Sequence, residues 1–173
     1  MLTFLIIYRK TENTLPLENP EFLDNLSAFS ISLWYYPLDD SRPGGKYESL
    51  LSRGEDGRCP NRSGEWSVGL YDARRAVFGH DNSVWAGPVS EVENWYHVVA
   101  VLDGDNYKIY WNGSLEEEET GNANCSNFRA AEDIGQLFVG AMFTGKIDDV
   151  LLYDRVLTAN EINELYELDT CCN

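Results

Sequence analysis

The sequence has few positive charges and no long apolar run, and each shortage excludes a class of protein. Only 13 lysines and arginines stand against 29 aspartates and glutamates in 173 residues, a formal net charge of −16. Nucleic-acid-binding proteins neutralise phosphates with basic side chains, so DNA or RNA would repel this chain. The longest apolar run, Leu2 to Tyr8, is shorter than the roughly 18 residues of a bilayer span. We therefore expect no nucleic-acid partner and no membrane insertion.

Cysteines are also few, but their even number fits an extracellular domain with one or two disulfides. No Cys-x-x-Cys pair is present, so the spacing does not favour zinc. Adjacent cysteines rarely bond each other, and we expect one bridge from the C-terminal tail to an internal loop. Reduced thiols in a cytosolic protein are the alternative. The disulfide candidates are Cys59, Cys125, Cys171 and Cys172.

Leu2 to Tyr8 lacks the basic flank and cleavage site of a signal peptide, so this chain shows no export signal. Asn-x-Ser/Thr sequons nevertheless favour a secreted or cell-surface glycoprotein. They lie at Asn25, Asn61, Asn112 and Asn124.

Apolar and aromatic residues are plentiful enough for one folded domain over residues 1–173. Hydrophobic residues make up 43% of the chain and aromatic residues 13%, whereas methionine occurs only twice. This aromatic-rich composition is typical of β-rich binding proteins rather than helical bundles.

Alternating patterns predict short antiparallel strands and one late helix. From Phe29 to Pro37 apolar residues alternate with a second face that carries Ser30, Ser32, Trp34 and Tyr36. The other strands are predicted at Leu2–Tyr8, Tyr47–Arg53, Trp66–Tyr71, Arg74–Gly79, Trp95–Leu102, Tyr107–Trp111, Leu137–Gly140 and Lys146–Tyr153. Thr158 and Glu161 form a capping box that predicts a helix of about ten residues. The pattern indicates an all-β, two-sheet antiparallel sandwich.

Three segments in this order resemble the laminin-G-like branch of the concanavalin-A-like lectin/glucanase jelly-roll family. They are FSISLWYYP (29–37), WYHVVAV (95–101) with YKIYWNG (107–113), and the stretch from Gly140 to Tyr166. The last contains FTGKIDDVLLYDRVL (143–157), which is similar to a closing strand and helix that pentraxins share. The resemblance implies a single jelly-roll domain. The family's usual first strand carries a Phe-Asp-Gly turn, which Leu2 to Tyr8 lacks, so that strand is expected to be absent or supplied from elsewhere.

The sequence offers little for catalysis. Glycoside hydrolases on this fold need two carboxylates on one strand face, about 5 to 9 Å apart, and no such spacing occurs. His80 and His97 do not form a Ser-His-Asp pattern, and His97 is expected to be a hydrogen-bonded core residue. Glu116 to Glu119 is interpreted as a solvated surface segment. No catalytic residue is therefore predicted.

A structural calcium ion is the expected cofactor, because the family often holds one at the sandwich rim. Asp148 and Asp149 are the candidate ligands, since calcium binds carboxylate oxygens. Lys146 or a backbone donor are the other partners open to this acid pair. The turn at Asp103, Asp105 and Asn106 is interpreted as hairpin chemistry.

Trp85 is the leading candidate for ligand contact. It lies in a Gly/Asn/Pro-rich segment, where an aromatic side chain is expected to be exposed, and the nearby Arg74 and Asp81 are the other ligand-binding candidates. Trp34 and Tyr36 are interpreted as structural. Packing of Trp85 beneath its own loop is the equally open alternative.

These observations predict a non-enzymatic extracellular recognition module that binds a glycan or a protein partner through loops at the rim. Two other functions stay open. One is a glycan-cleaving enzyme on the same fold, and the other is an adhesive or spacer domain of a larger surface protein.

Overall fold

The computed structural model describes residues 3–6, 15–17, 26–38, 47–53, 66–71, 74–79, 84–120, 137–140 and 143–170, with side chains for those between 26 and 168. Several sequence-based predictions fall outside these residues. They concern the four cysteines Cys59, Cys125, Cys171 and Cys172, the ligand candidate Asp81, His80, and the sequons at Asn25, Asn61 and Asn124.

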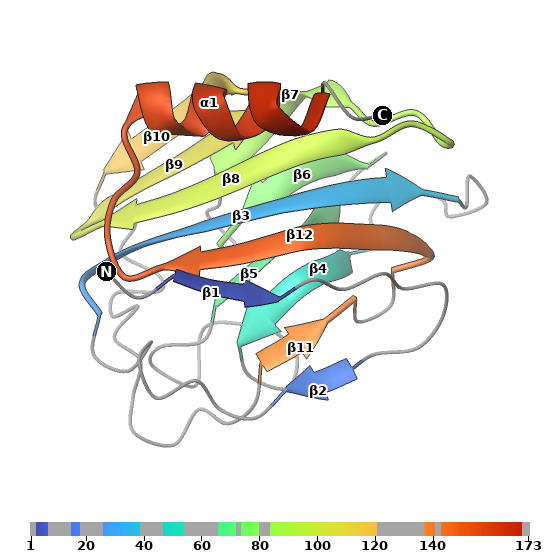
Figure 1. The fold of residues 1–173 in the computed structure, drawn as a ribbon, viewed down its shortest axis with the longest axis horizontal. Helices are drawn as coiled ribbons and strands as arrows, with labels where there is room; N and C mark the ends of the chain where they lie inside the picture. Colours follow the sequence, from blue (N-terminus) through green and yellow to red (C-terminus); the bar gives the residue numbers. More distant parts are fainter. Residues whose placement is uncertain are drawn as a thin grey trace.

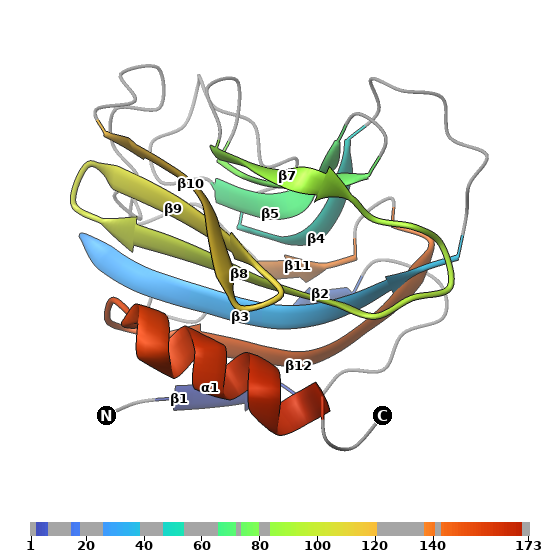
Figure 2. The same cartoon turned by 90° about the horizontal axis from the view of Figure 1, so that it is seen from above.

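The described strands form two six-stranded antiparallel sheets, which face each other in Figures 1 and 2. Sheet A consists, in spatial order, of β1 (Thr3–Ile6), β12 (Gly145–Tyr153), β3 (Ala28–Pro37), β8 (Tyr96–Asp103), β9 (Asn106–Trp111) and β10 (Ser114–Thr120). Sheet B consists of β2 (Leu15–Leu17), β11 (Leu137–Val139), β4 (Glu48–Arg53), β5 (Trp66–Tyr71), β6 (Arg75–Phe78) and β7 (Val84–Val89). The predicted all-β sandwich is confirmed.

The main core lies between the sheets and follows the alternation read from the sequence. On β3, Phe29 and Leu33 are buried on the inner face, and the Phe29 ring lies 5.5 Å from that of Trp66 on β5. The one polar group of this strand that points inward, the Tyr35 hydroxyl, is within 2.5 Å of Ser90 Oγ and accepts a hydrogen bond from Trp111 Nε1. Burial raises the pKa of Tyr35, so the phenol stays neutral.

The outer face of sheet A is buried as well, because helix α1 (Ala159–Thr170) covers it (Figure 2). A second apolar cluster therefore forms between the helix and β8, β9 and β12; it contains Val99, Val101, Tyr110, Tyr153, Leu157 and Ile162. This explains why the outward-facing residues of β8 are apolar. No helix in the described part of the chain has the length and apolar character that a bilayer span requires.

The predicted capping box is present at the start of α1. Thr158 N donates to Glu161 Oε2 at 2.8 Å, and Glu161 N donates back to Thr158 Oγ1 at 3.3 Å. Arg155 adds a bidentate ion pair with the same carboxylate, at 2.7 and 3.0 Å. The guanidinium and the Thr158 donors together lower the pKa of Glu161 to about 2.

Candidate functional site

The outer face of sheet B carries an array of aromatic side chains that no described helix covers. On β5, Val68 and Leu70 point into the core, so the alternate residues Gly69 and Tyr71 face outward. Tyr47 lies against Gly69, where a Cβ would be only 2.5 Å from Tyr47 Cζ, and its hydroxyl hydrogen-bonds Ser67 Oγ. Glycine at position 69 thus leaves room for an aromatic ring on the sheet.

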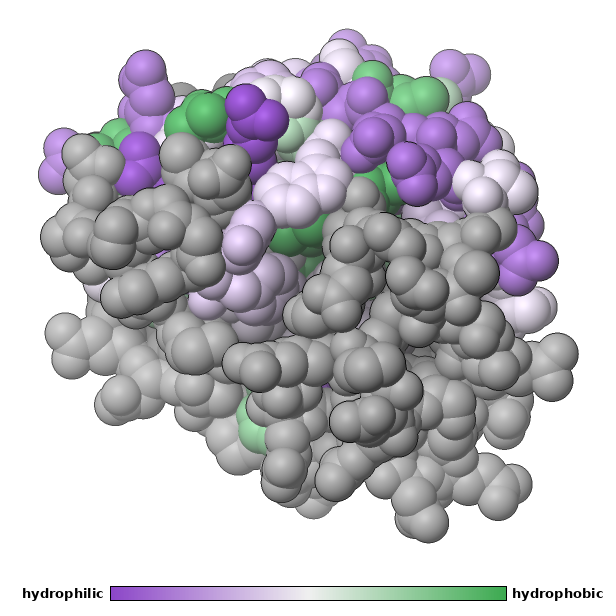
Figure 3. All heavy atoms as spheres, turned by 180° about the vertical axis from the view of Figure 1, so that it is seen from behind, coloured by the Kyte–Doolittle hydropathy of each residue, from purple (hydrophilic) through white to green (hydrophobic). Residues whose placement is uncertain are grey.

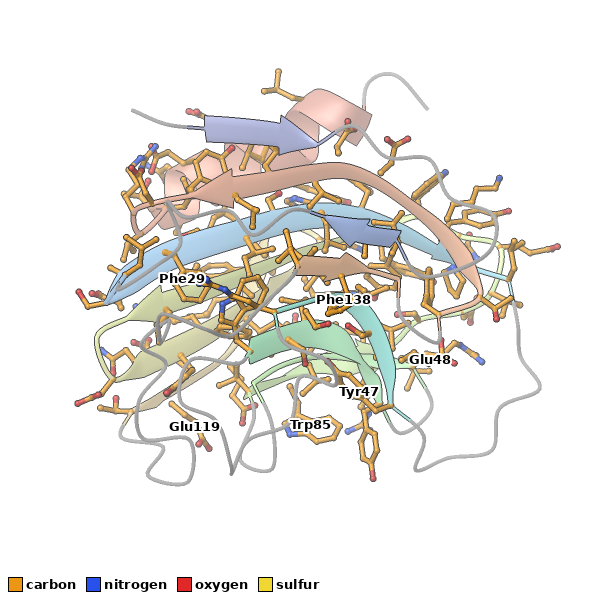
Figure 4. The ribbon with its side chains drawn as sticks, turned by 90° about the horizontal axis from the view of Figure 1, so that it is seen from below. Phe29, Tyr47, Glu48, Trp85, Glu119 and Phe138 are labelled. Carbon is orange, nitrogen blue, oxygen red and sulfur yellow. The ribbon has the colours of Figure 1, made fainter. Side chains whose placement is uncertain are left out.

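Trp85 lies on the same face, on the edge strand β7. It pairs with Val77 of β6, while its neighbours Val84 and Ala86 point into the core. The Trp85 and Tyr71 rings meet edge to face, with centroids 5.3 Å apart, and both side chains are only partly buried. Figure 4 shows Trp85 and Tyr47 on the outer side of sheet B, whereas Phe29 lies between the sheets. We call Tyr71 and Trp85 the Trp85 platform.

The surface seen from the side of sheet B reflects this composition. In Figure 3, side chains of intermediate hydropathy, as tyrosine and tryptophan have, gather near the centre of the described surface, between strongly hydrophilic groups. Rings of this kind offer an apolar face and a polar edge to a ligand.

Two carboxylates of β10 hold the strand that carries Trp85. Glu117 Oε2 accepts a hydrogen bond from Trp85 N at 2.5 Å, and Glu116 Oε2 accepts one from Gly87 N at 3.0 Å. The register of β10 shifts between Leu115 and Glu117, and this bulge lets two consecutive carboxylates reach the same neighbour.

The interpretation of Glu116 to Glu119 as a solvated segment was therefore wrong for its first half. An edge strand presents unpaired N–H groups, and here carboxylates satisfy two of them. The missed signal was the position of the acid run directly after the Asn112-Gly113 hairpin turn.

Arg74, the second predicted ligand residue, lies in the turn between β5 and β6 with φ 65°. Its Nε donates to the carbonyl of Ser90 at 2.6 Å, and its own carbonyl accepts from Ser90 N at 3.2 Å. Ser90 follows β7 at the end away from Trp85. Arg74 thus fixes the turn to the end of β7, and the structure does not bring it into contact with the indole.

His97 is the buried core residue that the sequence predicted. Its Nε2 lies 2.8 Å from Ser32 Oγ, and its ring packs against those of Trp34, at 5.0 Å, and Tyr166 of α1, at 6.1 Å. Burial lowers the pKa of His97 to about 4, so the imidazole is neutral at pH 7. The helix covers the ring, which leaves no path for a substrate to reach it.

Asp148 and Asp149 lie at a bulge in β12, where Asp149 has φ 48°. Asp148 Oδ1 accepts a hydrogen bond from Asp149 N at 3.0 Å, which is the backbone donor considered from the sequence. Calcium binds six to eight oxygen ligands. No group of three or more His, Cys, Asp or Glu side chains suited to a metal occurs among the described residues. The described side chains at the bulge therefore do not by themselves fit a calcium ion.

Asp103, Asp105 and Asn106 form the predicted hairpin turn. Asp103 pairs with Asn106, and Gly104 has φ 61° and donates its N–H to the Ser27 carbonyl at 2.7 Å. The positive φ explains the glycine.

Comparison with known proteins gives one family and a set of similar folds. The model of the protein family described as the concanavalin A-like lectin/glucanases superfamily matches residues 9–163 of this chain. No curated protein matches the sequence at a significant level.

The fold is similar to that of several solved binding domains. The carbohydrate-binding module CBM40 of the Ruminococcus gnavus IT-sialidase is 17% identical, with a TM-score of 0.70 over 95% of this chain and 98% of that one. The binding domain of Paraclostridial Mosquitocidal Protein 1 is 15% identical, with a TM-score of 0.69 over 96% of this chain and 46% of that one. Domain 4 of AbnA, an extracellular arabinanase from Geobacillus stearothermophilus, is 17% identical, with a TM-score of 0.60 over 93% and 81%. At these identities the likeness establishes the fold.

Proposed function

The chain belongs to the concanavalin A-like lectin/glucanases superfamily, and from this membership we propose that it is a non-catalytic module that binds a glycan at the Trp85 platform. The superfamily includes both lectins and glucanases, so the site has to distinguish binding from cleavage. The single observation that carries the proposal is the partly exposed Tyr71–Trp85 pair on a sheet face that no described helix covers.

The solved structures support a glycan as the ligand class. The Ruminococcus gnavus module has been solved with α2,3-sialyllactose, and the arabinanase domain with arabinotriose. Sugar rings present C–H faces that stack on aromatic side chains, and a few polar groups orient them. The Trp85 platform supplies such faces, and Glu117 fixes the backbone beneath them.

The acids described near the platform favour binding over cleavage. A glycosidase needs one carboxylic acid and one carboxylate free to act on the glycosidic bond. The Glu116 and Glu117 carboxylates accept hydrogen bonds from the β7 backbone instead. The proposal includes a secreted or cell-surface location, which the sequons and even cysteine count favour, and a glycan of an extracellular partner as the ligand.

Replacing Trp85 with alanine tests the proposal. The wild-type protein is first screened on a glycan array, and the affinity for each hit is measured by calorimetry. We expect Trp85→Ala to lower that affinity at least ten-fold, because the stacking face is lost, while far-UV circular dichroism stays unchanged. Leu168→Ala, which truncates a 65% exposed apolar side chain on α1, is the matched control. Equal affinity in Trp85→Ala and the wild type would rule out this site.

A further inference from the structure

Arg75 stands beside the Trp85 platform on the outer face of sheet B. It opens β6, where its side chain is exposed, and it lies directly opposite Tyr71 on β5 and Val89 on β7. Residues directly opposite each other in antiparallel strands project from the same face, with Cβ atoms about 5 Å apart. The Arg75 side chain therefore starts beside Tyr71, one of the two residues of the platform, and is long enough to bring its guanidinium to a ligand on the rings.

The Arg75 side chain makes no hydrogen bond or ion pair with any described residue, whereas two other cations of this acidic chain pair with carboxylates. Lys108 pairs with Glu118 at 3.0 Å, and Arg155 pairs with Glu161 at 2.7 Å. The neighbouring Arg74 donates to the Ser90 carbonyl. In a chain of net charge −16, a guanidinium that pairs with no described carboxylate and starts beside an aromatic pair is available to bind an anionic ligand.

A guanidinium and an aromatic face together select a particular ligand chemistry. The five N–H donors of arginine form a fork that matches a carboxylate in two parallel hydrogen bonds. The indole and phenol rings bind the apolar face of a sugar ring. We propose that the Trp85 platform binds a saccharide that carries a carboxylate, with the carboxylate on Arg75 and the sugar ring on the aromatic pair. This inference rests on the proposed function and names the substrate class of the same site.

The net negative charge of the chain sharpens this specificity. Charges on the rest of the surface are screened over a Debye length of about 8 Å at physiological ionic strength, whereas a contact pair is screened less. A single carboxylate can therefore form an ion pair with Arg75 and meet little repulsion from the other acidic side chains. A polyanion with many anionic groups meets repulsion from the surrounding acids, so we expect sulfated polymers to bind poorly.

Matched pairs of probes that differ only in the carboxylate charge test the inference. The affinity for 3′-sialyllactose and for trigalacturonic acid is compared with that for their methyl esters by calorimetry, which also distinguishes a sialic acid from a uronic acid as the source of the carboxylate. We expect at least one acid to bind the wild-type protein ten-fold or more tightly than its ester. Arg75→Gln should reduce that acid to the affinity of its ester, and Arg75→Lys should retain part of the preference.

Two further variants separate this inference from the proposed function. Lys146→Gln removes a positive charge from sheet A, where Lys146 Nζ lies 4.5 Å from the centroid of the Tyr36 ring, and should keep the full preference for the acid. Trp85→Ala should weaken acid and ester alike. Equal binding of acid and ester by the wild type, lost in Trp85→Ala, would overturn the inference and leave the proposed function standing. An unchanged preference in Arg75→Gln would also overturn it, and failure of every saccharide to bind would overturn both.

Discussion

Trp34 illustrates that the alternation of a strand predicts which face a side chain lies on but not whether another element covers that face. The alternation along β3 puts it on the outer face of sheet A, and it was interpreted there as structural. It is 6% exposed, because its ring packs against His97 and against Tyr166 of the helix, at 5.0 and 5.8 Å. The same alternation puts Trp85 on the outer face of sheet B, where no described helix covers it. Two tryptophans that both lie on the outer face of a strand thus differ in whether a described helix covers them.

The buried His97 predicts a pH dependence of stability. Its pKa is lowered to about 4 in the folded state from 6.5. The unfolded chain therefore binds the proton first as the pH falls, so the stability due to this group is complete above pH 6.5 and is lost toward pH 4. The full loss is about 3 kcal/mol at 1.36 kcal/mol per pKa unit.

Urea denaturation of the wild type and His97→Gln between pH 4.5 and 7.5 measures this effect. The variant should be less stable at pH 7, because the stacking on Trp34 is lost, but its stability should fall less steeply with acid. Parallel pH profiles would show that His97 does not titrate on unfolding.

Asn112 belongs to a sequon, but its side chain forms a hydrogen bond with the backbone of β8. Its side-chain Oδ1 accepts a hydrogen bond from His97 N at 2.9 Å, and its own N donates to the His97 carbonyl. The following Gly113 lies against Tyr166 of α1, where a Cβ would be 3.1 Å from the ring. We expect mass spectrometry of protein from a secreting eukaryotic host to find Asn112 without a glycan, because this turn packs under the helix. A glycan at Asn112 would contradict the packing described.

At the scale of elements, the seam between β10 and β7 joins the two sheets through side chains. Glu117→Ala leaves the Trp85 N–H without its acceptor, and we expect a loss of about 1–3 kcal/mol in the free energy of unfolding. Glu117→Gln retains an acceptor oxygen and should lose less. Glu119→Ala, at an exposed position of the same strand, controls for the removal of one negative charge and should change stability by less than about 0.5 kcal/mol. Equal stability of Glu117→Ala and Glu119→Ala in urea would show that the seam contributes nothing.

Helix α1 depends on the turn that precedes it. Ser30 on β3 accepts from Leu157 N and donates to the Arg155 carbonyl, both at 2.9 Å, and the capping box follows at Thr158. Thr158→Ala should cost about 1 kcal/mol, as is typical for the loss of an N-cap hydroxyl. Thr158→Ser keeps the hydroxyl and should stay near the wild type. Denaturation followed at 222 nm checks both, and no loss in Thr158→Ala would mean that Arg155 and Glu161 suffice to hold the helix.

For the whole molecule, calcium remains a prediction from the sequence. Calcium bound at the β12 bulge would take the Asp148 and Asp149 carboxylates together with oxygen ligands from other sources. We expect millimolar calcium to raise the melting temperature, EDTA to reverse the rise, and Asp148→Asn to abolish it. A melting temperature that changes with neither calcium nor EDTA would contradict the prediction.

Sequence and structure agree best where the period of the pattern is clear. The alternation of β3, the hairpin of β5 and β6, and the capping box of α1 were all predicted within a residue or two. The hydrogen-bonding role of Glu116 and Glu117 was missed because an acidic edge strand and a solvated surface segment have the same composition. The sequence analysis named Arg74 as a ligand candidate and did not consider Arg75, and nothing in two adjacent arginines indicates which one the turn will hold.

The sequence by itself determined the class of fold, because the period of the hydrophobic pattern and the turn residues act locally along the chain. Only the tertiary structure decided which sheet face the helix covers, which carboxylates bind the β7 edge, and which arginine stands beside the aromatic pair. These depend on strand register and on contacts between residues far apart in the chain, and a one-residue shift moves a side chain to the opposite face.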